Sequence, residues 1–115
     1  LTSLDSGPKI FASTPHDIKY ITTRIRFCRN SCPVAIQFYF DDYFKVILKH
    51  ATTTDGQMNR NCSYALGILA DKAPEQFLPH LGTAMMAVKM MYEASDADDA
   101  KENCIACLCR IIEKF

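Results

Sequence analysis

The chain has 115 residues with 13 basic and 13 acidic side chains, so its formal net charge is zero. Balanced charge excludes a dedicated nucleic-acid module, whose affinity depends on concentrated positive charge, and we expect no direct nucleic-acid partner. There is no apolar run of about 18 residues and no signal-peptide pattern in these residues, so we expect no membrane partner and a soluble intracellular protein. Cysteines that lie in helical segments are expected to be reduced thiols, which fits the cytoplasm and nucleus.

The first predicted helix follows an irregular segment, residues 1–13, that mixes Gly, Pro, Ser and Thr with scattered apolar residues. Thr14 is suited to the N-cap position and Pro15 to the first turn. Apolar residues then recur at spacings of three, four and three: Ile18, Ile21, Ile25 and Cys28. The β-branched residues in 21–25 leave a strand as the alternative, and Pro33 ends the element.

A second helix is predicted from Val34 to His50, where apolar residues lie on one stripe: Ile36, Phe40, Tyr43, Phe44, Ile47 and Leu48. Residues 51–56 form a polar connection of the length found between antiparallel helices. The third helix reaches Asp71 and carries its own stripe: Met58, Cys62, Ala65, Leu66 and Leu69.

A fourth helix opens at Pro74 and runs to Tyr92, and Pro79 inside it predicts a kink because proline removes one backbone hydrogen bond. Apolar residues on more than one side predict that this helix packs between layers, with a methionine cluster that fills the core: Met85, Met86, Met90 and Met91. Residues 93–102 are predicted as an acidic connection. The last helix carries another stripe: Cys104, Leu108, Ile111 and Phe115.

An internal repeat relates residues 60–72 to residues 102–114 at an offset of 42 residues, which places Asn61 on Asn103 and Leu66 on Leu108. A period of this size with helical apolar spacing is typical of HEAT and armadillo units. We therefore predict an all-α fold. It is an α-solenoid fragment over residues 14–115, made of antiparallel helical hairpins, with about two repeats (34–72 and 74–115) and one extra helix.

The two ends of the chain also favour a piece of a longer solenoid. It begins without Met at Leu1 and stops at Phe115 on an apolar helical position, without the polar cap that solenoids normally carry. We expect an internal fragment whose truncated ends self-associate through the apolar faces that a neighbouring repeat would cover.

The segment Arg60-Asn61-Cys62-Ser63-Tyr64-Ala65-Leu66-Gly67-Ile68-Leu69-Ala70 resembles the second helix of a HEAT repeat in the karyopherin-β (importin-β) family, most closely its importin-4 and importin-5 branch. Arg60 matches the HEAT arginine, Asp55 the aspartate of the turn before it, and Pro79 the proline often found inside the first helix. The sequence departs from the family where Cys replaces the usual Ala at positions 62 and 104. Glu102 stands where a second HEAT arginine is expected.

The resemblance implies a nuclear transport receptor without catalytic activity. Receptors of this family carry protein cargo on the concave surface of a solenoid, respond to the Ran GTPase, and meet Phe-Gly nucleoporin repeats on their outer helices. HEAT spacing is shared with scaffold subunits of phosphatases and chromosome-associated complexes, and such a structural protein is the alternative function.

The candidate partner-binding residues are Asn61, Asn103 and Arg60. The two asparagines are one repeat apart, and equivalent positions on stacked helices are about 10 Å apart and point the same way. We expect them to form a short ladder that pairs with the backbone of an extended cargo segment. The alternative is that they cap helix starts or bond to the adjacent repeat.

The sequence gives weaker support for a metal site or a catalytic cysteine. Six cysteines and three histidines could supply a zinc site or a thiol nucleophile, but the cysteines lie on helical stripes and are better explained as reduced packing residues. Asp96, Asp98 and Asp99 lack the Gly and Glu positions of a calcium-binding EF-hand loop and are expected to be solvated. We therefore predict no catalytic residues, no metal site and no cofactor.

Overall fold

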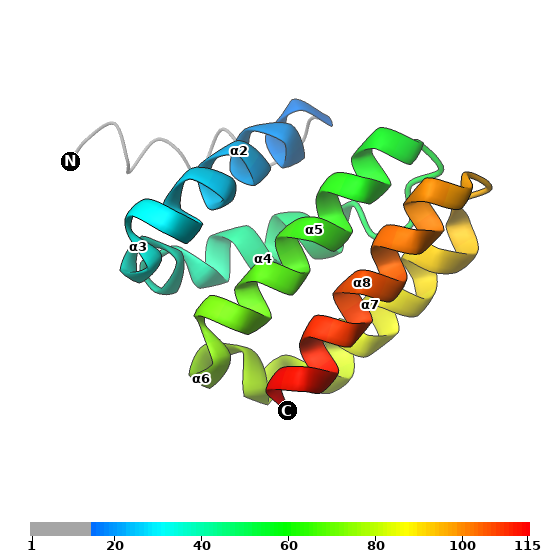
Figure 1. Cartoon of the computed structure of the whole chain (residues 1–115). Coiled ribbons are helices and arrows are strands. Elements are labelled where there is room, and N and C mark those ends of the chain that lie inside the picture. The colour runs from blue at the N-terminus through cyan, green and yellow to red at the C-terminus, as the bar shows by residue number, and fades with distance from the viewer. Residues whose placement is uncertain (1–14) are drawn as a thin grey trace.

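The computed structural model describes residues 15–115, and every element in this part of the chain is a helix (Figure 1). The elements are α2 (Pro15–Ser31), α3 (Pro33–Phe38), α4 (Phe40–Lys49), α5 (Gly56–Lys72), α6 (Pro74–Phe77), the 3-10 turn η1 (Leu78–His80), α7 (Leu81–Ala94) and α8 (Asp98–Lys114). The all-α prediction is confirmed for these residues, and the strand alternative for residues 21–25 is wrong. The predicted irregular segment 1–13 and the Thr14 cap lie outside the described residues.

The helices form two layers. In one layer α2, α5 and α8 lie side by side and run in the same direction (Figure 1), with α5 packed against both of its neighbours. The other layer contains α3 and α4, which pack on α5, and α6 and α7, which precede α8. In the first layer, α5 and α8 therefore each follow an antiparallel helix of the second layer, as the short connections between them require.

The 42-residue offset recurs in the element boundaries. Helix α5 begins at Gly56 and ends at Lys72, and α8 begins at Asp98 and ends at Lys114, so both ends are displaced by 42 positions. Both helices have 17 residues, and so does α2. The chain thus repeats a unit of one interrupted helix and one continuous helix, with α2 as an additional continuous helix at the start.

The first helix of each unit is interrupted. Pro33 and Pro74 occupy the first turns of α3 and α6, where the missing N–H would have no helical partner. The predicted kink at Pro79 is confirmed by the 3-10 turn η1. The continuous helix predicted from Val34 to His50 is wrong, because the chain bends at Tyr39 (φ −100°, ψ 14°). No proline marks that bend, so the sequence pattern could not indicate it.

Helix α5 is the centre of the core. Nine of its 17 residues are buried, because α2, α8 and the second layer cover it on three sides. The remaining core comes from the apolar stripes of the other helices, including Ile18, Ile21, Ile25, Ile36, Ile47, Phe77, Met91, Cys104, Cys107 and Ile111. At about 25 cal/mol per Å² of apolar surface removed from water, these contacts are the main source of stability.

An aromatic cluster joins the two units in the second layer. Phe40 and Phe44 of α4 stack on each other with ring centroids 5.3 Å apart, and both meet Phe77 edge-on. His80 of η1 is exposed and lies against the ring of Phe44, with ring centroids 5.0 Å apart.

Two further expectations differ from the structure. Of the methionine cluster predicted to fill the core, only Met91 is fully buried, while Met86 is 58% exposed, because no described element covers that side of α7. The acidic stretch 93–102 is mostly helical, since α7 continues to Ala94 and α8 begins at Asp98. Asp98 and Asp99 thus lie in the first turn of α8, where the helix dipole favours negative charge.

No helix in the described part of the chain is long and apolar enough to cross a membrane.

Candidate protein-binding face

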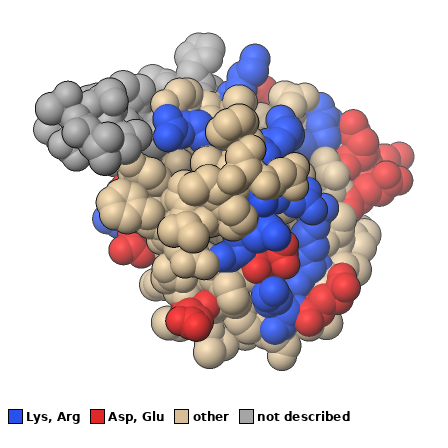
Figure 2. Space-filling view, turned by 60° about the vertical axis from the view of Figure 1, so that its left-hand side comes forward, with Lys and Arg blue, Asp and Glu red and all other residues tan. Residues whose placement is uncertain are grey.

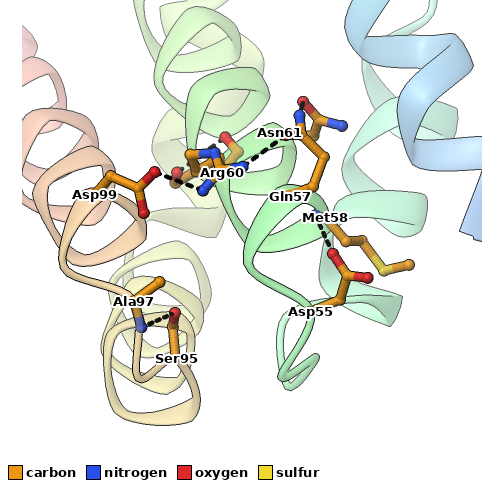
Figure 3. A network of polar contacts seen from close by, with 9 residues as sticks. Asp55, Gln57, Met58, Arg60, Asn61, Ser95, Ala97 and Asp99 are labelled. Carbon is orange, nitrogen blue, oxygen red and sulfur yellow. Dashed lines mark hydrogen bonds and ion pairs between the residues drawn. The ribbon is translucent and has the colours of Figure 1, made fainter.

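The face formed by α2, α5 and α8 carries all three predicted partner-binding residues, and the start of α5 positions two of them. Asp55 caps this helix by accepting a hydrogen bond from the Met58 backbone N–H at 2.9 Å (Figure 3). Thr53 Oγ1 accepts a hydrogen bond from the Asp55 N–H at 3.1 Å. An N-cap aspartate satisfies backbone donors that the helix leaves open and is worth about 1 kcal/mol. The cap sets where the helix starts, and so it fixes the positions of Arg60 and Asn61 on the helix.

A chain of polar contacts crosses this face at the N-terminal ends of α5 and α8 (Figure 3). Arg60 Nη1 donates to Asp99 Oδ2 at 2.8 Å, and Arg60 Nη2 donates to Gln57 Oε1 at 2.6 Å. Gln57 Nε2 in turn donates to Asn61 Oδ1 at 3.4 Å. The carboxylate partner of Arg60 is thus Asp99 in the next unit, whereas Asp55, the turn aspartate of the resemblance, caps the helix.

The ion pair in this network is exposed and adds little stability. The side chains of Arg60 and Asp99 are 28% and 65% exposed, so solvent screens their attraction. Exposed pairs of this kind contribute about 0–1 kcal/mol. The network therefore adds little to the stability of the fold. It holds polar side chains in place on the surface, where a partner can reach them.

The two predicted asparagines lie on neighbouring helices, but a contact with the polar network is seen only for Asn61. Asn61 belongs to the network, and its backbone carbonyl also accepts from Thr22 Oγ1 of α2 at 3.4 Å. Asn103 is half-buried on α8, one turn beyond Asp99 and on the same side of that helix. Both asparagines thus lie near the starts of neighbouring parallel helices, as the repeat predicts.

A different asparagine carries the buried polar contact between the helices. Asn59 is fully buried, its Nδ2 donates to the Met91 carbonyl at 2.7 Å, and its Oδ1 accepts from Cys104 Sγ at 3.5 Å. It joins α5 to the end of α7 and to α8. Asn59 was not among the candidate residues, although its spacing of three from Cys62 places it on the apolar stripe of α5, and a polar residue there indicates a buried hydrogen bond.

Tyr64 lies at the centre of the same face, between arginines from both neighbouring helices. Arg29 Nη1 of α2 donates to the Tyr64 hydroxyl at 3.3 Å, and the Arg26 guanidinium carbon lies 4.9 Å from the centre of the ring. Arg110 of α8 approaches the ring from the other neighbour at 5.7 Å. None of these arginines was selected from the sequence, because residues 26, 64 and 110 meet only in the folded chain.

The cysteines divide into buried and exposed thiols. Burial raises the pKa of Cys62 and of Cys107 to about 12, so both remain protonated at neutral pH and pack as small apolar groups. Cys32 and Cys109 are exposed. Within residues 15–115 no three His, Cys, Asp or Glu side chains are grouped so that they could hold a metal ion.

Comparisons with protein-family models, curated proteins and solved structures gave no match. The resemblance to the karyopherin-β family therefore rests on the residues of this chain.

Proposed function

We propose that the chain is a segment of a HEAT-type α-solenoid that binds other proteins on the face formed by α2, α5 and α8. The observation that carries this proposal is the 42-residue displacement of both ends of α5 and α8, with an interrupted antiparallel helix before each. Units that repeat in this way stack into an extended surface rather than closing around a central site, and such surfaces bind polypeptides. The proposal assigns the chain no catalytic role.

Within that class, we propose a nuclear transport receptor of the karyopherin-β type that works in the cytoplasm and nucleus. The support is the motif from Arg60 to Ala70 and the position of Arg60, which links its own unit to Asp99 of the next. This assignment implies three partners: protein cargo, the Ran GTPase and Phe-Gly nucleoporin repeats.

The transport assignment is tested by measuring binding of the chain to Ran–GTP, to Ran–GDP and to a Phe-Gly repeat peptide by biolayer interferometry. A transport receptor segment is expected to bind the Phe-Gly peptide or to prefer Ran–GTP over Ran–GDP. A HEAT scaffold subunit of a phosphatase or chromosome complex is expected to bind neither. Binding to neither would contradict the transport assignment while leaving the repeat architecture intact.

The asparagine pair is tested by the double substitution Asn61→Ala and Asn103→Ala. An asparagine amide pairs with peptide backbone, so we expect the double variant to weaken binding of extended peptides whatever their charge, with an unchanged melting temperature. The measurement is fluorescence anisotropy with basic, neutral and acidic peptides, beside a thermal melt. A lower melting temperature with unchanged affinity would make the pair structural.

A further inference from the structure

The arginines around Tyr64 are held in place by the packing of three helices. Arg26 and Arg29 are three residues apart on α2 and so point to the same side, towards α5. Arg110 reaches across from α8 because Gly67 has no side chain: a Cβ built there would lie 3.1 Å from Arg110 Cδ. The stem of Arg110 thus lies over the backbone of α5, with its guanidinium group close to Tyr64.

This cluster has positive charge without a matching negative charge. The ion pairs among the described residues are Arg60–Asp99, Lys72–Asp71 and Lys114–Asp71, and none of them includes an arginine of the cluster. Contact with the electron-rich ring of Tyr64 offsets part of the repulsion between the guanidinium groups but leaves the net charge unchanged. Figure 2 shows Lys and Arg side chains gathered in a band on one face of the molecule, with a few Asp or Glu side chains within and beside it. A bound anion would neutralise part of the positive charge of the three arginines.

Carboxylates suit this cluster better than nucleic acid does. A guanidinium fork pairs with a carboxylate, as it does with a phosphate, through two parallel hydrogen bonds, so the distinction rests on the aromatic ring. Binding of single-stranded nucleic acid requires aromatic faces on which bases stack, and Tyr64 has guanidinium groups over its ring instead. Asp71 and Glu113 line a hollow of about 320 Å³ with Arg110 and Lys114. Their carboxylates would repel any polyanion there, so the proposed site ends at Arg110.

We propose that α2, α5 and α8 bind an extended acidic peptide segment whose carboxylates pair with Arg26, Arg29 and Arg110. Neighbouring helix axes are about 8–10 Å apart, so a path from α2 over α5 to α8 is about 20 Å long. An extended chain covers that distance with about six residues. The inference uses the same face as the proposed function and specifies the charge of the segment bound there, so it rests on that proposal for its biological role.

The test uses a fluorescein-labelled peptide of alternating Glu and Ser, titrated with the whole chain in anisotropy measurements. We expect binding that weakens as salt is raised, because the contacts are between exposed charges. The triple substitution Arg26→Gln, Arg29→Gln and Arg110→Gln is expected to lower the affinity at least tenfold. A Lys–Ser peptide of the same length should bind at least tenfold more weakly than the Glu–Ser peptide.

A matched control removes the same kind of charge from the other layer. Lys45→Gln with Lys49→Gln changes exposed lysines of α4 and should alter the affinity less than twofold. Tyr64→Phe keeps the ring and loses only the hydroxyl that Arg29 contacts, so its affinity should fall by less than that of the triple variant. Circular dichroism melts on each variant show whether the fold is retained.

Several results would overturn the acidic-peptide site. They are a wild-type chain that does not bind the Glu–Ser peptide, equal affinity for the Lys–Ser peptide, and equal losses in the triple variant and the lysine control. Tighter binding of an oligothymidylate that displaces the peptide would assign the cluster to nucleic acid instead. The result of the peptide titration does not depend on whether the chain binds Ran or Phe-Gly repeats, and the reverse also holds. The two proposals are therefore judged separately.

Discussion

At the scale of single residues, the structure separates polar side chains that hold the fold from those that remain available to a partner. Asn59 is fully buried and uses both ends of its amide, whereas Asn61, two positions later, is half-buried in a surface network. The helical rotation between them points one side chain into the core and the other outwards. Residue type alone does not distinguish the two roles.

Substitution of Asn59 by Leu is expected to destabilise the protein by about 1–3 kcal/mol. The change leaves the buried Met91 carbonyl without its 2.7 Å hydrogen bond, and an unsatisfied buried group costs about 1–3 kcal/mol. The measurement is the free energy of unfolding from urea titration. Asn30→Leu is the control, because Asn30 is exposed near the end of α2 and should change stability by less than about 0.5 kcal/mol. Equal effects of the two substitutions would show that the Asn59 hydrogen bonds do not stabilise the fold.

At the scale of helices, close approach of α5 and α8 depends on Gly67. A Cβ at this position would meet the Arg110 stem at 3.1 Å and the Cys107 Cα at 3.6 Å. Gly82, in the first turn of α7, has nothing within 4 Å of such a Cβ. The two glycines therefore offer a matched comparison of helix propensity with and without a steric constraint.

We expect Gly82→Ala to stabilise the protein by about 0.5 kcal/mol, because alanine restricts the unfolded chain without a clash. Gly67→Ala should gain less than Gly82→Ala, since Arg110 must move aside. Gly67→Val should destabilise the protein by about 1–3 kcal/mol through overpacking. Urea unfolding measures all three. A stabilising Gly67→Val would show that α5 and α8 are not closely packed at this point.

At the scale of the whole molecule, the outer side of α7 and α8 is an apolar face. A groove of about 500 Å³ lies there, lined by Met85, Val88, Lys89, Tyr92, Glu93, Cys104, Ile105 and Leu108. The repeat explains its composition. Ser63 and Ala70 of α5 are buried in the structure, and the positions 42 residues later, Ile105 and Ile112, are 50% and 62% exposed. The face thus has the character of a surface on which another helical unit packs.

The chain is expected to self-associate through this face. Sedimentation velocity at increasing concentration should show a growing dimer fraction, which Ile105→Lys with Ile112→Lys should abolish while changing stability by less than about 1 kcal/mol. Val34→Lys is the control, because Val34 is 67% exposed on α3, away from α7 and α8. A chain that stays monomeric at every concentration, or a dimer that the lysines leave intact, would contradict this use of the face.

The sequence by itself determined the helical class and the repetition, because both follow from local spacing, but it did not indicate the bend at Tyr39. Apolar residues three and four apart define one side of a helix wherever it packs, and the prolines at 33, 74 and 79 act on their own backbone. The candidates Asn61 and Asn103 were accessible to the same reasoning, since their equivalence is an offset in the chain, whereas Arg60 was selected by its match to the HEAT arginine.

Only the tertiary structure decided which surfaces are covered and which side chains meet. All four methionines of α7 are suited to a core by residue type. Met86 is nevertheless exposed, because burial also requires a neighbouring element to cover the side chain. Tyr64 meets Arg29, 35 positions earlier in the chain, and Arg110 from the following unit. These contacts arise from the alignment of three parallel helices. Local spacing fixes the face that a helix presents, but not the side chains that neighbouring helices bring against it.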